Sequence, residues 1–542
     1  MSKLRLYIST VSHLKPSQVA YRVWRKLGGK TPLRVGYVPR PDAAKTDVSS
    51  IPVLSELDFD PAFLARFDVD AILADRIELL HHEERVDWRE SWHAELSTPL
   101  WRFNLHYHEY LLPLAKAYMD TGDGRYLDKG KAIVAAWMAA CPRAKGGAAW
   151  DPYVISLRVA NWLAFLGELS DELAEDETFV ARINASLAEQ YVHLAQHLEK
   201  DLLANHYLEN LKALVMLACR FNDERTLAFA LPELRKQVSE QILPDGMHFE
   251  LSPMYHKIVL EDLLRAAAFL EMRGCDAGDL ADRFRLQDMC DALWSMESDA
   301  ARTPLFNDSG DNVAKGRDAL LGCARNRFGI EPRFHSVLKD SGYCILERRT
   351  PAGFVKAIFD AGRPGPTYAM GHAHCDALSF ECFIDGEPWI VNCGTYAYQD
   401  KRRLDFKRTL SHSTVCVEDA EQHECWAPFR VAEFSRAHLL EVGANHAEGA
   451  LLQRGLGIKV KRTISLEDEG ILVRDESEPA SRISSAFVFA GEAPHVEGEV
   501  DSVSYAPEFG SARPARRVIA DAQGGCRETW IPYPAFRQRG SR

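Results

Sequence analysis

The 542-residue sequence lacks three features that would assign it to common classes of protein. No apolar run approaches the roughly 20 residues that a membrane-spanning helix needs. None of its 12 cysteines forms a Cys-x-x-Cys pair, which favours reduced, mostly buried thiols over a zinc knuckle or a disulfide framework. Basic residues are not in excess, since 78 Asp and Glu against 65 Lys and Arg give a formal charge of −13. A general nucleic-acid-binding protein would show a basic face.

These absences set expectations for location and partners. The first 27 residues are basic but lack the uninterrupted apolar run of a secretory signal, so we expect a cytoplasmic location, with the periplasm as the alternative. Neither a nucleic acid nor a membrane is expected as a partner. A polyanionic substrate stays compatible with the acidic balance, because a local basic cleft can form in an acidic protein.

The spacing of the apolar residues changes once along the chain. Over residues 56–335 they recur at helical spacing, and many helices in series without strands between them predict a bundle, solenoid or toroid. Pro232 is expected in a first helical turn, where its missing N–H costs nothing. The expected helices are 110–118, 156–169, 187–197, 210–221, 232–242 and 258–273.

Residues 336–542 consist of short β-branched and aromatic runs, which are typical of an antiparallel β-sandwich. Asp385-Gly386-Glu387 between two of these runs predicts a hairpin turn. The chain is therefore predicted to be a multidomain α+β protein, in which an arm of residues 1–55 precedes the helical domain. The expected strands are 343–347, 354–359, 378–384, 388–391, 413–417 and 470–474.

Two histidine-bearing segments far apart in the chain contain the candidates for chemistry. Asn205-His206 lies in the helical part, and the segment 371–376, GHAHCD, lies in the strand-rich part. A site at the junction of the two parts can place an amide, imidazoles and a phenol around one sugar ring. Such groups are needed to remove a weakly acidic proton from the carbon beside a carboxylate.

The ordered set of motifs resembles the heparinase II/III superfamily of polysaccharide lyases. The resemblance implies an incomplete (α/α) toroid followed by an antiparallel β-sandwich, and an acidic, uronate-containing polysaccharide as substrate. The segments that match, in chain order, are 103–107, 150–153, 158–162, 204–210, 245–256, 306–311, 371–379 and 411–414.

The resemblance also implies roles for four residues. Asn205 would neutralise the substrate carboxylate through its side-chain amide, which donates hydrogen bonds and has no proton to lose. Tyr255 would protonate the leaving oxygen and is also a candidate base. His206 and His372 are both candidates for abstracting the C5 proton or neutralising the carboxylate. Taken singly, Asn205 is more typical of a turn or helix cap and His206 of a core histidine, and Tyr255 also suits a packed aromatic residue at a helix start, so the functional interpretation depends on their joint occurrence.

Further residues are candidates for substrate binding. Arg158 and Asn161 are about one helical turn apart and are expected to share a helix face toward the cleft. The segment 401–408 contains five cations and suits sulfate or carboxylate binding, although such a run is as typical of a solvated face. The candidates are Arg158, Asn161, Glu209, Tyr398, Arg402 and Arg403.

A structural zinc ion is also implied by the resemblance, at positions that match His374, Asn392 and His412. Asn392 stands where relatives have an aspartate, and a neutral amide oxygen is a poor zinc ligand. Strand alternation is expected to point Cys393 away from the side of Asn392. Zn²⁺ is therefore a candidate cofactor, with a metal-free hydrogen-bonded network as the alternative, and no organic cofactor is expected.

The leading hypothesis is a lyase that cleaves a uronate-containing polysaccharide by β-elimination. A glycosaminoglycan is the first choice of substrate, followed by alginate or a bacterial surface polysaccharide. Three alternatives stay open: a glycoside hydrolase that uses Glu250 and Asp308, a C5-epimerase on the same scaffold, and a non-catalytic polysaccharide-binding or assembly protein.

Overall fold

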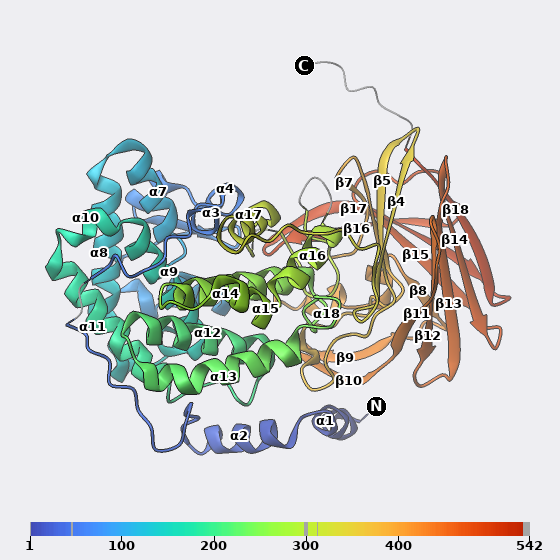
Figure 1. The fold of residues 1–542 in the computed structure, drawn as a ribbon. Coiled ribbons are helices and arrows are strands. Elements are labelled where there is room, and N and C mark those ends of the chain that lie inside the picture. The colour runs from blue at the N-terminus through green and yellow to red at the C-terminus, as the bar shows by residue number, and fades with distance from the viewer. Residues whose placement is uncertain (1, 45–46, 298–301, 312, 535–542) are drawn as a thin grey trace.

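The structure, a computed structural model, describes residues 2–44, 47–297, 302–311 and 313–534. Within these ranges a helical domain is followed by a β-sandwich, and Figure 1 shows the two side by side. The multidomain α+β architecture predicted from the change in apolar spacing is confirmed. All 12 cysteines are free thiols, as expected, and only Cys275 and Cys526 are exposed.

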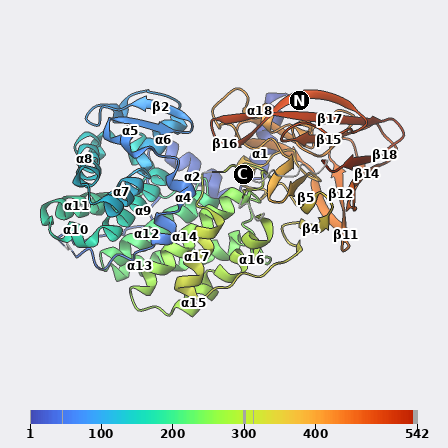
Figure 2. The ribbon, with the colours of Figure 1, turned by 90° about the horizontal axis from the view of Figure 1, so that it is seen from above.

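The helical domain is an incomplete (α/α) toroid, whose helices form an arc beside the sandwich (Figure 2). Each of the six expected helices overlaps an observed one, because the apolar spacing marks the face that packs into a single large core. The longer helices are α6 (Pro99–Tyr107), α7 (Leu111–Thr121), α8 (Gly124–Ala140), α9 (Pro152–Glu168), α11 (Glu177–Leu194), α12 (Ala204–Arg220), α13 (Glu224–Gln241), α14 (Pro253–Glu271), α16 (Leu286–Met296) and α17 (Arg317–Phe328). The shorter elements of this domain are α3 (Ser55–Asp58), α4 (Pro61–Leu64), α5 (Val69–Leu73), α10 (Ser170–Ala174), α15 (Ala277–Arg283) and the hairpin of β1 (Arg76–Leu79) with β2 (His82–Arg85).

The prediction for Pro232 is wrong. α13 begins at Glu224, where the Asp223 side chain caps the helix by accepting from the Thr226 N–H at 3.0 Å. Pro232 therefore lies inside the helix, where a proline removes one backbone hydrogen bond. Ala230 and Leu234 on either side are buried in the helical core, and this packing keeps the helix continuous through the proline.

The sandwich consists of two antiparallel sheets with an apolar core between them. The hairpin turn at Asp385-Gly386 is confirmed, since both residues have positive φ as a tight turn of this kind requires. The first sheet contains β3 (Val337–Leu338), β4 (Tyr343–Thr350), β5 (Gly353–Asp360), β6 (Phe380–Ile384), β7 (Glu387–Val391), β8 (Val415–Val417), β15 (Ile483–Phe489), β16 (Glu499–Glu508) and β17 (Ser511–Ala522). The second contains β11 (Arg436–Val442), β12 (His446–Gln453), β13 (Ile458–Leu466), β14 (Gly470–Glu478) and β18 (Cys526–Pro532), and β9 (His423–Ala427) pairs with β10 (Arg430–Phe434) outside both.

The toroid and the sandwich are joined by a third apolar cluster. Met247 and Leu251 from the toroid side pack with Phe306, Tyr343 and Ile358. The Tyr343 hydroxyl also donates to the Leu251 carbonyl at 2.7 Å. Because buried apolar contacts fix the junction, side chains from the two domains can meet in a defined geometry there.

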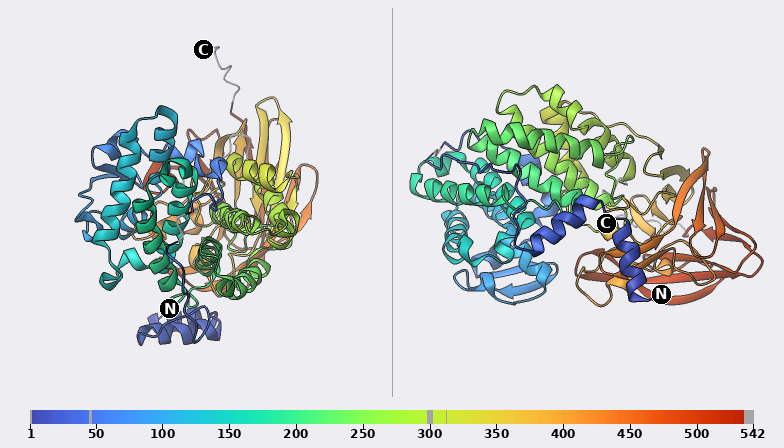
Figure 3. Two further views of the ribbon diagram at one scale, coloured as in Figure 1. Left: turned by 60° about the vertical axis from the view of Figure 1, so that its left-hand side comes forward. Right: turned by 90° about the horizontal axis from the view of Figure 1, so that it is seen from below.

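The N-terminal arm connects the two domains on the outside (Figure 3). α1 (Lys3–Ser12) lies against β10, where Ser9 donates to the Ala432 carbonyl at 2.7 Å. α2 (Pro16–Lys26) lies against the toroid, and its buried Gln18 donates to the carbonyls of Leu202 and Tyr368 at 3.1 and 3.3 Å. Among the helices of the described residues, none combines the length and the apolar character that crossing a membrane requires.

We expect Arg462→Ala to destabilise the sandwich by about 3–5 kcal/mol, because it leaves Asp475 as a buried and uncompensated charge. Arg462 is fully buried on β13 and bonds both oxygens of Asp475 at 2.7 and 2.8 Å. Urea denaturation measures the effect. The matched control is Arg474→Ala on β14, an exposed partner of Glu476 that should change stability by no more than about 1 kcal/mol. Equal losses of unfolding free energy in the two variants would contradict the role of Arg462 in compensating the buried charge of Asp475.

Candidate active site

A cavity of about 1130 Å³ lies where the toroid, the sandwich and the N-terminal arm meet. Asn205 and His206 from α12, Tyr255 from α14 and His372 from the short turn Met370–His372 all line it. The structure therefore brings together the four predicted catalytic residues. These residues are far apart in the sequence, and the apolar junction between the two domains brings them together.

A strained turn sets the start of α12. Leu203 and Ala204 both have positive φ, 63° and 50°, which is costly for residues other than glycine. The turn presents the Asn205 N–H to the Glu250 carboxylate at 3.2 Å, and the Asn205 side-chain amide donates to both Glu250 oxygens at 2.9 Å. Glu250 thus caps the helix and fixes the orientation of Asn205. The Asn205 Oδ1 atom is buried without a hydrogen-bond partner in the described residues.

His206 carries a positive charge at neutral pH. Its Nδ1 atom is 3.0 Å from the Glu199 carboxylate, and its ring lies 4.5 Å from that of Tyr153. Burial opposes the charged form, but Glu199, together with Asp151 and Glu250, raises the pKa of His206 to about 9. An imidazolium in the lining suits the binding of a carboxylate and does not suit a general base.

Asp308 is the hydrogen-bonding centre of the sandwich side of the site. Its carboxylate is fully buried and accepts from His372 Nδ1 and His374 Nε2, both at 2.8 Å, and from Thr395 at 3.2 Å. Arg403 binds both of its oxygens. Despite burial, Arg403 and the two histidines hold the pKa of Asp308 well below its usual range. The carboxylate therefore stays ionised and holds the His372 ring with Nε2 facing away from it.

The other ring nitrogen of His372 is directed at the toroid side of the cavity. His372 Nε2 is 3.6 Å from Glu250 Oε2, so the imidazole spans the gap between Asp308 and Glu250. An imidazole oriented by a carboxylate through one nitrogen can accept a proton at the other.

Tyr255 packs against this imidazole, with 4.2 Å between the ring centroids. Its hydroxyl is 2.9 Å from that of Tyr398. Burial raises the pKa of both phenols above the ordinary value. Both are therefore protonated at neutral pH, and the pair forms a proton-donating wall beside His372.

Only two of the six predicted substrate-binding residues, Asn161 and Tyr398, line the cavity. The expectation for Arg158 is wrong, since it is fully buried and its guanidinium donates to Gln190, His106 and Ala149 and stacks on Trp137. Glu209 is also buried, and its charge is compensated by Lys212 at 2.5 Å. Both residues have structural roles beside the cavity.

The two candidate arginines of the 401–408 segment, Arg402 and Arg403, are likewise absent from the lining. Arg403 is buried in its ion pair with Asp308, and Arg402 is exposed and pairs with Asp400 at 3.0 Å. Of these two arginines, Arg403 thus supports the site through Asp308, and Arg402 lies on a solvated face. The sequence of this segment alone does not distinguish a buried, ion-paired arginine from an exposed one.

Glu199 and Tyr153 are residues of the site that the sequence analysis does not single out, and Asp308 and Glu250 are named there only as a hydrolase pair. Glu199 and Tyr153 line the cavity beside His206. Glu199 precedes the strained turn and also accepts from Asn210 Nδ2 at 3.1 Å. An acidic residue shortly before Asn-His was the available signal, but its spacing matches no regular helical or strand contact because the intervening chain turns.

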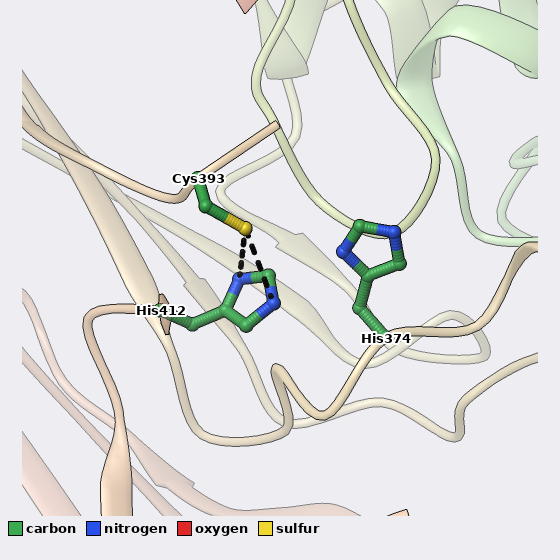
Figure 4. Close-up of side chains that lie close together, drawn as sticks. All are labelled: His374, Cys393 and His412. Carbon is green, nitrogen blue, oxygen red and sulfur yellow. Dashed lines mark hydrogen bonds between the residues drawn. The ribbon is translucent and has the colours of Figure 1, made fainter. Parts of the chain in front are cut away.

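His374, Cys393 and His412 form a buried cluster whose ligand atoms all lie within 4.8 Å of one another (Figure 4). The predicted set with Asn392 is wrong: the Asn392 side chain donates to Ser379 and accepts from the Ser413 N–H. β7 ends at Val391, so the alternation of a strand no longer applies at Cys393, which points at His412 with Sγ 3.6 Å from Nε2.

The cluster has the chemistry of a metal site. His374 Nδ1 is buried without a hydrogen-bond partner in the described residues, while its other ring nitrogen is bonded to Asp308. Burial lowers the pKa of both histidines and raises that of Cys393. Neutral imidazoles are ready to bind a cation, and a cation would supply the charge that a thiolate needs at this depth. These residues fit a divalent metal.

Two family models match the chain. A model described as Heparinase II/III N-terminus matches residues 54–320, and one described as Heparinase II/III-like, C-terminal matches residues 331–539. Both matches agree with the motifs that carried the resemblance.

Curated relatives and solved structures are consistent with these matches. A heparin-sulfate lyase of Pedobacter heparinus is 23% identical over 348 residues, 59% of this chain and 52% of that protein. One of Bacteroides thetaiotaomicron is 22% identical over 461 residues, which is 75% of this chain and 64% of that protein. This chain therefore spans about half to two thirds of the length of these relatives.

The crystal structure of a heparinase III has a TM-score of 0.65 at 15% identity, covering 96% of this chain and 92% of that one. The crystal structure of a mutant heparan sulfate lyase of Pedobacter heparinus has a TM-score of 0.55 at 17% identity, covering 96% of this chain and 88% of that one. At these identities the structural likeness establishes the toroid-and-sandwich fold.

We expect Glu199→Gln to lower the pKa of His206 from about 9 toward the ordinary range, because the neighbouring negative charge is removed while burial remains. NMR titration of the histidine ring protons measures the change, with His206→Gln to assign the signal. Glu233→Gln on α13 is the control and should leave the titration as in the parent. A His206 pKa unaffected by Glu199→Gln would contradict the ion pair.

Proposed function

Because the chain belongs to the heparinase II/III-like family, we propose that it is a polysaccharide lyase that cleaves a uronate-containing chain by β-elimination. The observation that carries the proposal is one cavity lined by a charged imidazole, a carboxylate-held imidazole and a protonated phenol. These are His206, His372 and Tyr255.

The reaction removes the C5 proton of a uronate, so negative charge develops on a group that already carries a carboxylate. A cation beside that carboxylate stabilises the enolate-like transition state. His206 is the best candidate, because its pKa of about 9 keeps it charged. Asn205 is a weaker candidate than the sequence implied, since its side-chain amide already donates to Glu250. We assign Asn205 to shaping this end of the cavity and to a secondary contact with the carboxylate.

His372 and Tyr255 supply the two proton transfers. His372 Nε2 accepts the C5 proton, and the ionised Asp308 at Nδ1 stabilises the imidazolium that forms. Tyr255 donates its proton to the oxygen of the departing sugar at C4, and Tyr398 holds the phenol in position. The C4–O bond breaks as the C4=C5 double bond forms, so no water is consumed.

The geometry disfavours the hydrolase alternative. A hydrolase that uses Glu250 and Asp308 needs one carboxylic acid of raised pKa. Asp308 is fully buried, is not part of the cavity lining, and its oxygens are bonded by Arg403, His372 and His374, so it is not placed to flank a glycosidic bond with Glu250.

The lining contains cations both with and without a carboxylate partner. Arg66 pairs with Glu109 at 2.7 Å and Lys212 with Asp262 at 3.0 Å. Arg22, Lys26 and Arg430 also line the cavity and form no ion pair within the described residues, so groups are present for more than one anionic substituent of a chain. We therefore propose glycosaminoglycan-type chains as substrates.

Zinc is the metal that best fits the cluster of His374, Cys393 and His412, since imidazole and thiolate are its usual ligands. The ion would anchor His374 and, through Asp308, the orientation of His372. Its contribution is structural, and each step above is performed by side chains of the chain itself.

We expect the purified protein, assayed with hyaluronan, unsulfated heparosan, alginate, chondroitin sulfate and heparin, to generate the ultraviolet absorbance of an unsaturated uronate on at least one of these chains. Tyr255→Phe removes the donated proton and should lower kcat by about 10²–10⁴-fold. Tyr396→Phe, outside the lining, is the matched control and should keep the parental rate.

Other outcomes of this assay would replace the proposal. Products that are heavier by one water indicate a hydrolase, and solvent deuterium in an uncleaved polymer indicates an epimerase. Binding without cleavage, unaffected by Tyr255→Phe, indicates a non-catalytic binding protein.

We expect zinc to co-purify with the protein, measured by plasma mass spectrometry, and Cys393→Ser to weaken its retention against a chelator by about tenfold or more, because a thiolate ligand is lost. Asn392→Asp, at the position first matched to a ligand, is the control and should retain the parental content. Zinc that is absent from the parent, or held equally well by Cys393→Ser, would contradict the assignment.

A further inference from the structure

The N-terminal arm has a charge opposite to that of the chain as a whole. Residues 1–40 contain nine Lys and Arg and no Asp or Glu, in a protein with a formal charge of −13. Lys3, Lys26, Lys30, Arg34 and Arg40 are exposed. The arm is thus a polybasic surface attached to an acidic protein.

α1 is amphipathic in the reverse sense to an ordinary surface helix. Polar side chains on one face contact the protein, where Ser9 and the helix-capping His13 bond the Ala432 carbonyl at 2.7 and 2.9 Å. Leu4 and Ile8, one turn apart on the opposite face, are 70% and 61% exposed. A helix normally buries its apolar face, so this face lacks a partner among the described residues.

α2 repeats the arrangement. Gln18 and Arg25 face inward, and Arg25 pairs with Asp201 at 2.5 Å. Val23, Trp24 and Leu27 point outward, with 54%, 53% and 76% of their surfaces exposed. Polar contacts attach the helix to the toroid, and the apolar side chains contribute little to that attachment.

The exposed apolar surface is concentrated in this arm. Of the 21 large apolar side chains exposed in the described ranges, ten lie between Leu4 and Val38. Figure 3 shows both helices along one outer edge of the molecule, crossing from the toroid to the sandwich. A single flat surface can therefore contact both helices.

We propose that this arm docks the protein on an anionic phospholipid bilayer, with the apolar faces of α1 and α2 inserted among the headgroups. Exposed apolar side chains flanked by Lys and Arg are the features by which interfacial helices bind such surfaces. A second copy of the chain is a poorer occupant, because a symmetric contact would oppose two arms of the same charge. The absence of a spanning segment led us to expect no membrane partner, but that criterion does not address helices that lie in the interface.

The arm also borders the cavity, where Thr10, His13, Arg22 and Lys26 are part of the lining. Docking through α1 and α2 would therefore hold the cavity close to the bilayer surface. The inference depends on the arm alone and not on the proposed lyase chemistry.

Co-sedimentation of the full chain with vesicles tests the proposal. Binding is expected to vesicles in which a third of the lipid is phosphatidylglycerol, to be weak with phosphatidylcholine alone, and to fall as salt is raised. Val23→Asp combined with Leu27→Asp should lower the partition coefficient by about tenfold or more. Lys3→Gln and Lys30→Gln should each lower it about fivefold, equivalent to about 1 kcal/mol per cation at an anionic surface.

Leu452→Ser, which removes an exposed leucine from β12 on the sandwich, is the matched control and should bind like the parent. Brominated lipid should quench the parent more than Trp24→Phe, and circular dichroism checks that each variant is folded. Absent binding, equal binding to both kinds of vesicle, or binding unchanged by the Val23 and Leu27 substitutions would overturn the proposal. So would a dimer, seen by analytical ultracentrifugation, that those substitutions dissociate.

Discussion

The site depends on one buried carboxylate. Asp308 is removed from solvent, and a charge at that depth is tolerated only when it is paired and hydrogen-bonded. Arg403 supplies the opposite charge through two contacts, and His372, His374 and Thr395 also donate to the carboxylate. The same atoms that satisfy the carboxylate therefore fix one imidazole toward the cavity and another toward the metal-type cluster. A change at any of these partners is transmitted to His372 through Asp308.

The toroid side of the cavity depends on a strained backbone turn rather than on a buried ion pair. The turn before α12 places two residues with side chains in the left-handed region, and each costs about 1–3 kcal/mol. Glu250 offsets part of this cost by capping the helix and holding the Asn205 amide. Such strain near His206 and Glu199 is consistent with a turn that is kept for the position of its side chains. The apolar junction then sets this rigid turn opposite His372.

Much of the fold was predictable because it depends on local periodicity. Helices and strands were found where apolar side chains must reach a core, and the Asp385-Gly386 turn was found because few residues adopt its backbone. Pro232 was misplaced because core packing on both sides overrode its preference for a first turn.

The four candidate catalytic residues were identified together through their motifs. Their partners were not, because the location of a charge such as Arg158 or Arg403 depends on residues distant in sequence. Cys393 was misjudged because strand alternation was extended beyond the end of β7.

The most direct test of the account is a crystal structure of the Tyr255→Phe protein with a bound uronate oligosaccharide. We expect the His372 Nδ1–Asp308 bond to persist, the uronate carboxylate to contact His206, and C5 to lie within about 3.5 Å of His372 Nε2. A carboxylate bound away from His206, or a C5 atom facing a group other than His372, would contradict the central claim that Asp308 positions the base.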